Sequence, residues 1–361
     1  MIKETIESDI LIIGAGLTGL TLAYALRNSG LSIKLVEARS RVGGRIETVE
    51  TVDGVKVEMG ATWLGNKHTY LARLLAELGI NTFEQIIGDT AIYEAISTSP
   101  HYLARIPPNP EPSLRITGGS EALIKKLSSY ISVENIFLDA KVESIKKSKI
   151  GVITDCVHSI FKSKIVISTL PPNLLVNSIY FDGALPHSLL SVAKNTHTWM
   201  GESIKIALTY ATPFWRSEEL SGTIMSNVGP IPEMYDHSNA EDNRYALMGF
   251  LNGGYFQLTK KERLAIIMKQ LKKYYGKLAE TYTNYEERVW RIESETFTPY
   301  ESNVLPHQLN GHDVYQESYL ADRLMLAGTE TSTYYPGYME GAVYSGLLTS
   351  KKILEKLKHD R

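Results

Sequence analysis

The stretch Asp9-Ile-Leu-Ile-Ile-Gly14-Ala-Gly16-Leu-Thr-Gly19 decides the fold of this 361-residue chain. Its first five residues end in four consecutive aliphatic side chains, which predicts a buried strand. A G-x-G-x-x-G pattern follows at once, and Leu17 to Arg27 carry apolar side chains at helical spacing. A strand, a glycine turn and a helix in this order are typical of a dinucleotide-binding βαβ unit, because the free N–H groups at the helix N-terminus can bind a pyrophosphate.

Each glycine of the turn has its own expected role. Gly14 allows the tight turn, Gly16 lets a pyrophosphate approach the backbone, and Gly19 lets the helix pack closely on the strand. Leu31 to Val36 predict the second strand of the unit, and Glu37 stands at its end, 18 residues after Gly19. A carboxylate at this position can accept hydrogen bonds from both hydroxyls of an adenosine ribose. The alternative is a structural glycine turn that binds no ligand.

The composition excludes several classes of protein. Hydrophobic residues make up 43% and charged residues 22%, and the formal net charge of −2 predicts no nucleic-acid partner. The first nine residues do not resemble a signal peptide. No apolar run approaches the roughly 18 residues of a membrane span. The single cysteine, Cys156, excludes an internal disulfide and a multi-cysteine metal site, and it favours a reducing, cytoplasmic location. The nine histidines lack metal-binding spacing, so no metal is expected.

The segment after Glu37 distinguishes FAD from NAD. In Glu37-Ala-Arg39-Ser-Arg41-Val-Gly43-Gly44-Arg45, two glycines and three arginines follow the ribose-binding carboxylate. Adjacent glycines let backbone N–H groups converge on an anion, and arginines neutralise it. A pyrophosphate that is held from both sides favours FAD, which lies extended through its domain. A second G-x-G-x-x-G unit for NAD(P)H is lacking, so the electrons are expected to come from an organic substrate.

Three blocks of sequence resemble the flavin-containing amine oxidase family, which includes monoamine and polyamine oxidases. The first block is D-I-L-I-I-G-A-G-L-T-G-L with the later V-E-A-R-S-R-V-G-G-R. Residues 57–65, V-E-M-G-A-T-W-L-G, are similar to the family segment that runs beside the flavin ring. Residues 326–331, L-A-G-T-E-T, and 337–342, G-Y-M-E-G-A, resemble the closing signature of the family. The blocks lie at both ends of the chain with more than 250 residues between them, so chance agreement is a poor explanation.

The resemblance implies an α/β fold with a Rossmann-type, glutathione reductase-like FAD-binding domain and an α+β substrate domain. The FAD-binding domain is expected to be discontinuous and to comprise residues 1–75, 113–190 and 293–361. The substrate domain is expected to comprise residues 76–112 and 191–292. Elements predicted from periodicity are a helix capped by Ser120, an antiparallel ribbon over 140–145 and 150–154, strands over 164–168, 203–210, 245–251 and 324–327, and helices over 260–275 and 337–348.

The motifs and the resemblance together imply the residues that contact FAD. Val142 is expected to lie at the adenine through its backbone, and Glu330 to accept a hydrogen bond from a ribityl hydroxyl. Pro299 occupies the position at which monoamine oxidases carry the cysteine that binds flavin covalently, so FAD is expected to be bound non-covalently. The expected FAD-binding residues are Gly14, Gly16, Leu17, Thr18, Gly19, Glu37, Ala38, Arg39, Gly43, Gly44, Arg45, Gly60, Ala61, Thr62, Trp63, Val142, Trp290, Gly328, Thr329, Glu330, Gly337, Tyr338, Met339 and Ala342.

The resemblance assigns catalytic roles to three residues. Lys205, in a predicted strand, matches the family lysine that holds a water near flavin N5, although a strand lysine more often points to solvent. Tyr338 matches one wall of the aromatic cage that orients the amine nitrogen and favours the neutral amine. Tyr300, ten residues after Trp290, is the candidate for the opposite wall.

The expected activity is that of an FAD-dependent amine oxidase. A C–H next to an amine nitrogen gives a hydride to flavin N5, the imine is hydrolysed to a carbonyl compound, and molecular oxygen is converted to hydrogen peroxide. One alternative is an FAD-dependent desaturase or dehydrogenase of a non-amine substrate. Another is a non-catalytic FAD-binding subunit.

One segment departs from the pattern of the larger family members. Only about 50 residues separate the Trp63 block from Gly118-Gly119, where those members carry a long, mainly helical insertion that roofs the substrate cavity. The short segment favours an open site or one that a second subunit completes, so a homodimer is a possible assembly. Tyr334-Tyr335-Pro336 also departs from the tryptophan-containing pattern of many members, which affects the shape expected beside the flavin.

Overall fold

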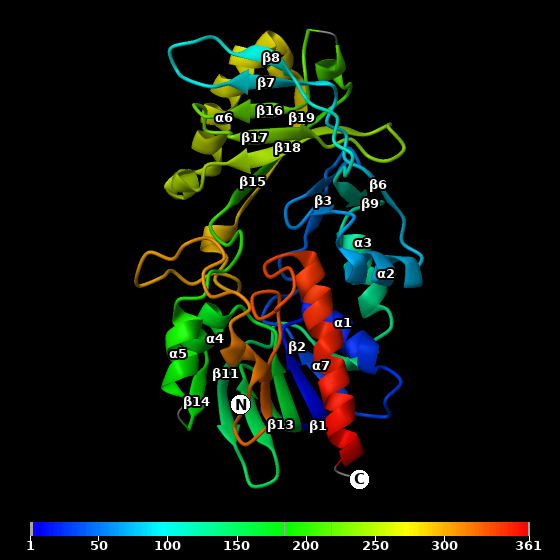
Figure 1. Ribbon diagram of the computed structural model, residues 1–361, viewed down its shortest axis with the longest axis vertical. Coiled ribbons are helices and arrows are strands. Elements are labelled where there is room, and N and C mark those ends of the chain that lie inside the picture. Colours follow the sequence, from blue (N-terminus) through cyan, green and yellow to red (C-terminus); the bar gives the residue numbers. More distant parts are fainter. Residues whose placement is uncertain (1–2, 184, 218, 360–361) are drawn as a thin grey trace.

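The computed structural model describes residues 3–183, 185–217 and 219–359, and two sheets dominate it (Figure 1). The first sheet is built around the long strand β1 (Glu4–Ile13), which pairs in parallel with strands on both sides. Its strand order is β10-β2-β1-β13-β12-β11-β14, and β21 joins β13. The other bounds are β2 (Ile33–Val36), β10 (Ile136–Phe137), β11 (Val142–Lys147), β12 (Val152–Cys156), β13 (Ser159–Ser168), β14 (Tyr180–Asp182), β20 (Ser318–Tyr319) and β21 (Leu324–Leu326).

Alternation along β1 explains why helices cover both faces of this sheet. Ile10 and Ile12 pack in the same core as the helix that follows the glycine turn and the C-terminal helix, whereas Leu11 and Ile13 belong to the core on the opposite face. Figure 1 shows the C-terminal helix α7 running beside α1 on one side, with α4 and α5 on the other. The bounds are α1 (Leu17–Leu26), α2 (Thr69–Glu77), α3 (Glu121–Ser128), α4 (Pro172–Ser178), α5 (His187–Lys194) and α7 (Met339–His359).

The second sheet has the order β19-β15-β18-β17-β16-β7-β8 and is antiparallel except where β16 pairs with β7. The predicted strands over 203–210 and 245–251 are confirmed as β15 (Ile204–Tyr210) and β18 (Tyr245–Leu251). Helix α6 (Lys260–Tyr275) has the predicted bounds, because Thr259 and Glu262 form a reciprocal capping box at its start. The remaining strands are β7 (Thr90–Glu94), β8 (Tyr102–Arg105), β16 (Ile224–Ser226), β17 (Glu233–Asp236) and β19 (Tyr282–Val289).

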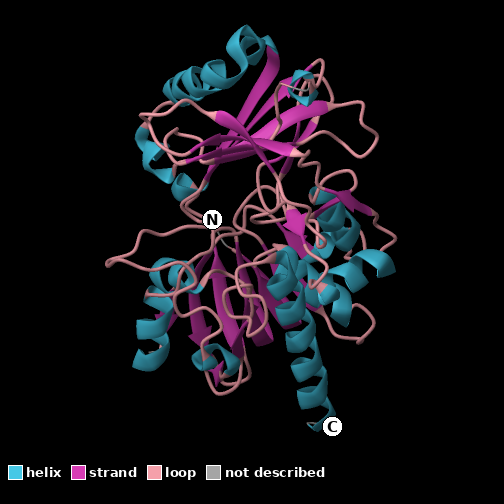
Figure 2. Ribbon diagram, turned by 45° about the horizontal axis from the view of Figure 1, so that its top comes forward, coloured by secondary structure: helices cyan, strands magenta, loops and turns pink. Residues whose placement is uncertain are grey.

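Short elements connect the two sheets, and loops fill much of the region between them (Figure 2). They form a hairpin of β3 (Thr48–Glu50) with β4 (Lys56–Glu58) and a three-stranded sheet of β5 (Trp63–Leu64), β9 (Leu114–Ile116) and β6 (Thr82–Glu84). Single 3-10 turns occur at Val133–Asn135, Phe214–Arg216, Gly253–Gln257, Gly276–Thr281, Trp290–Ile292 and Asp313–Gln316. Within the described ranges, no helix has both the length and the apolar character needed to cross a membrane.

The start of helix α3 corrects one expectation. Ser120 precedes the helix as predicted, but its side chain makes no capping hydrogen bond, and its buried hydroxyl has no partner among the described residues. Its backbone already has helical angles, with φ −63° and ψ −24°, whereas a capping serine is usually extended. The Ser120 N–H instead donates to Glu58 Oε1 at 2.7 Å, and the Glu121 N–H donates to Thr48 Oγ1 at 3.0 Å.

Candidate active site

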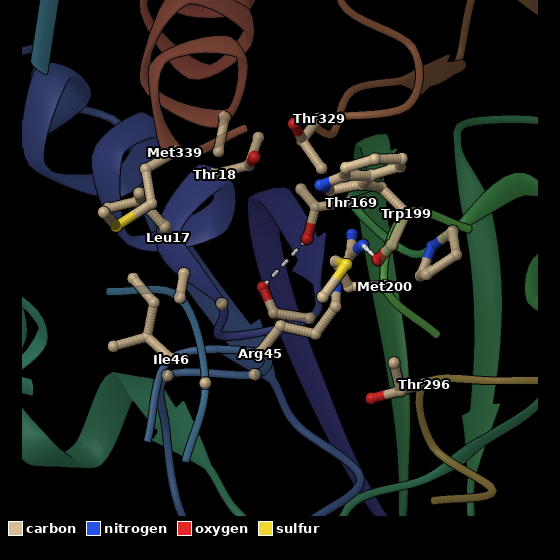
Figure 3. A pocket seen from close by; sticks show the side chains of 18 of the residues that line it. Leu17, Thr18, Arg45, Ile46, Thr169, Trp199, Met200, Thr296, Thr329 and Met339 are labelled. Atoms are coloured by element: carbon tan, nitrogen blue, oxygen red, sulfur yellow. Dashed lines mark hydrogen bonds between the residues drawn. The ribbon is translucent and has the colours of Figure 1, made fainter. Parts of the chain in front are cut away.

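A cavity of about 580 Å³ extends from the glycine turn after β1 to strands β15, β17 and β18 of the second sheet. Gly14 and Gly16 line one part of it, and Lys205 and Phe250 line another. Figure 3 shows Leu17 and Met339 side by side in the wall, with Trp199 and Met200 beside Arg45. An elongated cavity between two sheets has room for an extended cofactor and for a substrate at its far end.

The glycine turn has the geometry that the motif predicts. Gly14 has φ +99°, a conformation that side chains rarely adopt. A Cβ on Gly19 would lie 2.0 Å from the Gly14 carbonyl oxygen, so Gly19 permits the close contact of helix and strand. A Cβ on Gly16 would meet no described protein atom closer than 3.9 Å, although Gly16 lines the cavity. The protein itself therefore does not require glycine at position 16, whereas a phosphate in the cavity would.

Glu37 is positioned by the backbone on both sides of it. Its Oε2 accepts the N–H of Ala15 at 2.9 Å, and its Oε1 accepts the N–H of Arg39 at 3.0 Å. The side chain is buried and lines the cavity next to Ala38 and Val142. This carboxylate with an adjoining apolar wall fits an adenosine ribose and its base.

The three arginines after Glu37 do not act alike. Arg45 lines the cavity and forms a bidentate ion pair with Glu330, with N–O distances of 2.6 and 2.8 Å. Arg39 also lines the cavity and donates to Thr296 Oγ1 at 2.7 Å. Arg41 lies outside the lining and donates to backbone carbonyls of its own loop, so it stabilises that loop rather than facing a pyrophosphate.

Four of the expected site residues do not line the cavity: Gly19, Tyr300, Gly328 and Glu330. Glu330 is buried, and both of its carboxylate oxygens are bound by Arg45, so the structure does not present it to a ribityl hydroxyl as expected. Gly328 lies behind the wall, where a Cβ would come within 3.4 Å of the Thr169 carbonyl oxygen. The other residues expected to contact FAD line the cavity, among them Thr329, Gly337, Tyr338, Met339 and Ala342 at the start of α7.

Lys205 does not point to solvent. It is the second residue of β15, 2% of its surface is exposed, and its Nζ donates to the carbonyl oxygen of Gly60 at 2.5 Å and to Thr62 Oγ1. Its Nζ also lies 5.2 Å from the ring centre of Trp63. Burial lowers the pKa of Lys205 to about 7, although the nearby Glu58 carboxylate acts in the opposite direction. Lys205 can therefore exchange its proton near neutral pH while it faces the cavity.

Tyr338 lies in an aromatic cluster, but its neighbours differ from those expected. The ring of His307 stacks beside it at 5.8 Å between centroids, and the ring of Trp199 lies at 5.9 Å. Tyr300 was expected to form the opposite wall, but its hydroxyl accepts the Thr198 N–H at 2.7 Å, which holds it outside the cavity lining. Trp199 and His307, rather than Tyr300, therefore flank Tyr338 in this structure.

Sequence reasoning missed several residues of the wall: His68, Trp199, Met200, Glu233 and Phe250. None of them belongs to a recognisable motif. Trp199 could have been suspected, because it is one of only four tryptophans and stands just before the lysine strand. Glu233 gives no comparable signal, since its place in the wall depends on the pairing of β17 with β18.

The glycine turn, the buried Glu37 and the extended cavity define a dinucleotide-binding protein of the Rossmann class. The sequence profile described as flavin containing amine oxidoreductase matches residues 17–112 and 108–354. The chain therefore belongs to the flavin-containing amine oxidoreductase family, and both the predicted family and the predicted fold class are confirmed. As predicted, it is a flavin-dependent amine oxidase.

Individual relatives agree with this assignment. The probable flavin-containing monoamine oxidase A of Dictyostelium discoideum is 25% identical, with 98% of this chain and 99% of that protein covered. The flavin-containing amine oxidase B of Homo sapiens is 24% identical, with 97% and 87% covered. A solved structure of putrescine oxidase bound to putrescine has a TM-score of 0.84 at 24% identity and covers 97% of this chain and 100% of that one. Cyclohexylamine oxidase from Brevibacterium oxydans IH-35A has a TM-score of 0.85 at 19% identity, with 98% and 100% covered.

The alignment lengths indicate that this chain is a short family member. The alignment with the Dictyostelium protein spans 456 positions, whereas 98% of 361 residues is about 354, so about 100 positions have no counterpart in this chain.

Proposed function

We propose that this chain binds FAD non-covalently in the cavity and oxidises the carbon–hydrogen bond next to an amine nitrogen. The observation that supports this most strongly is the buried Lys205, whose Nζ is held by Gly60 and Thr62 in the wall of the same cavity as the glycine turn. Burial of a lysine costs stability, because burial disfavours its charged form, so a buried lysine in the wall of a cavity favours a functional role for this side chain.

The lining residues fit FAD from one end to the other. Glu37 would hold the ribose hydroxyls, the N–H groups of Leu17 and Thr18 would face the pyrophosphate, and the N-terminal turn of α7 at Met339 would face the flavin. No described residue of the lining is a cysteine, and Cys156, the last residue of β12, is buried in the hydrophobic core, which favours non-covalent binding. When bound, the flavin would supply the chemistry of accepting two electrons and a proton from the α-carbon of the amine, as a hydride.

The side chains of the protein would bind, orient and desolvate the amine. Trp199 and Tyr338 present aromatic side chains to the cavity, and Met200 also lines it. This apolar environment favours the neutral amine over the ammonium. Lys205 would hold a water molecule or stabilise negative charge that develops on oxygen. The product would be an imine, which water hydrolyses to a carbonyl compound, and oxygen would leave as hydrogen peroxide. Oxygen as the acceptor, a homodimeric assembly and a cytoplasmic location remain predictions.

The proposal is tested by two measurements on the purified protein. Acid precipitation should release FAD into the supernatant, because no covalent bond retains it. Incubation with primary amines, diamines and amino acids in air should give hydrogen peroxide and a carbonyl product in equal amounts. Bound FAD without turnover of any amine would favour a desaturase, a dehydrogenase of a non-amine substrate or a non-catalytic subunit instead.

A further inference from the structure

The imidazole ring of His307 stacks against the indole of Trp199. The two ring centroids lie 3.9 Å apart, with 23° between the ring planes, which is the closest aromatic stacking among the described residues. Trp199 lines the cavity (Figure 3), whereas His307 does not. The imidazole also stacks beside the ring of Tyr338, at 5.8 Å and 17°. His307 therefore packs against two aromatic rings of the wall without lining the cavity itself.

The backbone of His307 has a conformation that most side chains avoid. Its φ is +59°, in the left-handed region, where a residue other than glycine is uncommon and stores strain. Two hydrogen bonds hold it there. The His307 N–H donates to His197 Nδ1 at 3.3 Å, and the His197 N–H donates to the Gln308 carbonyl oxygen at 3.0 Å. The strained residue is thus the one that brings an aromatic ring to the back of the wall.

Gly337 leaves the space that this pair of rings occupies. A Cβ on Gly337 would lie 2.9 Å from the Cβ of Trp199 and 3.2 Å from the Cε1 of His307. A side chain at position 337 would therefore collide with the Trp199 side chain. His307 and Gly337 together restrict where the indole can lie.

The backbone of Trp199 is held by a separate set of contacts. Its N–H donates to Glu330 Oε1 at 3.3 Å, and its carbonyl oxygen accepts a hydrogen bond from Arg45 Nη1 at 3.0 Å. Because the backbone is fixed in this way, the position of the indole depends on rotation of the side chain. A stacked ring restricts that rotation.

We propose that His307 is a positioning residue, which holds the indole of Trp199 in the wall of the cavity and thereby favours binding of the amine substrate. The inference rests on the proposed function and adds to it a residue outside the cavity lining. Burial lowers the pKa of His307, although the Glu330 carboxylate acts in the opposite direction, so the ring is uncharged at neutral pH. The uncharged ring of another residue can therefore replace it.

A different role for His307 is to shape its loop. The two roles make opposite demands on the side chain at this position. A role in the loop alone requires a residue that tolerates the left-handed backbone, such as asparagine, and needs no ring. The positioning role requires an aromatic ring, even one that this backbone conformation disfavours.

The first test compares His307→Asn, which suits the backbone but has no aromatic ring, with His307→Phe, which keeps a ring. The control is Leu309→Asn, because Leu309 has φ +57° in the same loop and does not line the cavity. The substrates are benzylamine, butylamine and 1,4-diaminobutane, with the FAD-loaded protein.

We expect His307→Asn to raise the KM by about 3- to 10-fold and to leave kcat within about twofold, because an aromatic pair contributes an effect of this size. His307→Phe should return the KM to within about twofold of the wild type, although its strained backbone should lower the melting temperature. Leu309→Asn should match the wild type in KM.

The second test needs no turnover. The tryptophan bands of the near-ultraviolet circular dichroism spectrum report fixed packing of the indole rings. His307→Asn should weaken these bands, and His307→Phe should restore them. In the Trp199→Leu background His307→Asn should leave the bands unchanged, because the ring on which His307 acts is absent.

A wild-type KM in His307→Asn together with a raised KM in His307→Phe would overturn the inference and assign His307 to the loop. An equal loss of the tryptophan bands with and without Trp199 would overturn it as well. If the wild type oxidises none of the three amines, the proposed function fails, and the spectra decide the inference separately. A loss of signal that depends on Trp199 would then support the positioning of the indole, and unchanged spectra would contradict it.

Discussion

The Nζ of Lys205 lies 2.5 Å from the carbonyl oxygen of Gly60, and this contact joins strand β15 of the second sheet to the segment that runs along the cavity. Gly60 itself has no room for a side chain, since a Cβ would lie 2.1 Å from the Arg45 carbonyl oxygen. The lysine is therefore held by backbone that cannot shift freely. Its position couples the cofactor-binding part of the cavity to the strands that form the substrate end.

Replacement of Lys205 should slow the reoxidation of the flavin by oxygen without preventing its reduction by the amine. In Lys205→Met we expect FAD to remain bound and an amine still to reduce it under anaerobic conditions. Reaction of the reduced enzyme with oxygen should slow by about 100-fold, because the cation that stabilises charge on oxygen is absent. Stopped-flow reoxidation measures this rate, and Lys261→Met, which alters an exposed lysine of α6, is the control. Unchanged reoxidation would remove Lys205 from the oxidative step.

Burial of Lys205 should also make the free energy of unfolding depend on pH. Its pKa is about 7 in the folded protein and is near 10.5 when the chain is unfolded, so between these values the unfolded state binds more protons. The free energy of unfolding contributed by Lys205 should therefore rise as the pH increases from 7 toward 10, by up to about 1.4 kcal/mol per pH unit. Denaturant unfolding of the wild type and of Lys205→Met at several pH values measures the difference. A difference that falls with pH would contradict the assigned burial.

Two glycines of the same turn should respond differently to alanine. In Gly19→Ala the new methyl group collides with the Gly14 carbonyl oxygen, so we expect loss of stability and poor recovery of folded protein. In Gly16→Ala the methyl group meets no described protein atom closer than 3.9 Å, so the apoprotein should keep its melting temperature within a few degrees. The methyl group would instead occupy space toward the cavity, and the affinity for FAD should fall at least about tenfold. Fluorescence titration with FAD and thermal melting of both variants test this contrast, and wild-type FAD affinity in Gly16→Ala would argue against a pyrophosphate at this turn.

Replacement of Trp199 should affect the KM for amines, whereas replacement of Tyr300 should affect mainly the stability of the protein. Tyr300→Phe removes the acceptor of the buried Thr198 N–H, which should cost about 1–2 kcal/mol of stability and leave the KM for amines nearly unchanged. Trp199→Phe should alter the KM, because Trp199 lines the cavity beside Tyr338. Steady-state kinetics and denaturant unfolding of both variants distinguish the two positions. A large KM change in Tyr300→Phe alone would restore it to the aromatic wall.

The sequence predicted those features of the fold that depend on residues close together in the chain. The unit from β1 to Glu37 follows from hydrophobic runs and glycine spacing, and α6 follows from its capping box and apolar face. Side-chain partners from distant segments could not be predicted. The Glu58 carboxylate, at the end of β4, accepts the Ser120 N–H at the start of α3, where the sequence predicted capping by the Ser120 side chain. Arg45 forms an ion pair with Glu330, which lies 285 residues later in the sequence.

The candidate site was predictable to a similar extent. Motif residues that line the cofactor end were identified, because their roles depend on local turns and helix starts. Glu233 and Phe250 were not, because only the register of three strands brings them beside Lys205. The misplacement of Tyr300 shows that a matching position in the chain does not fix the direction of a side chain when a nearby N–H, that of Thr198, competes for its hydroxyl.

The visible spectrum of the purified protein under anaerobic conditions, before and after addition of amines, shows whether this chain is a flavoprotein that oxidises amines. We expect a flavin spectrum that bleaches with an amine and returns when air is admitted. A flavin spectrum that stays oxidised with monoamines, diamines, polyamines and amino acids would contradict amine oxidation. A protein that binds no flavin at all would contradict the assignment of the cavity itself.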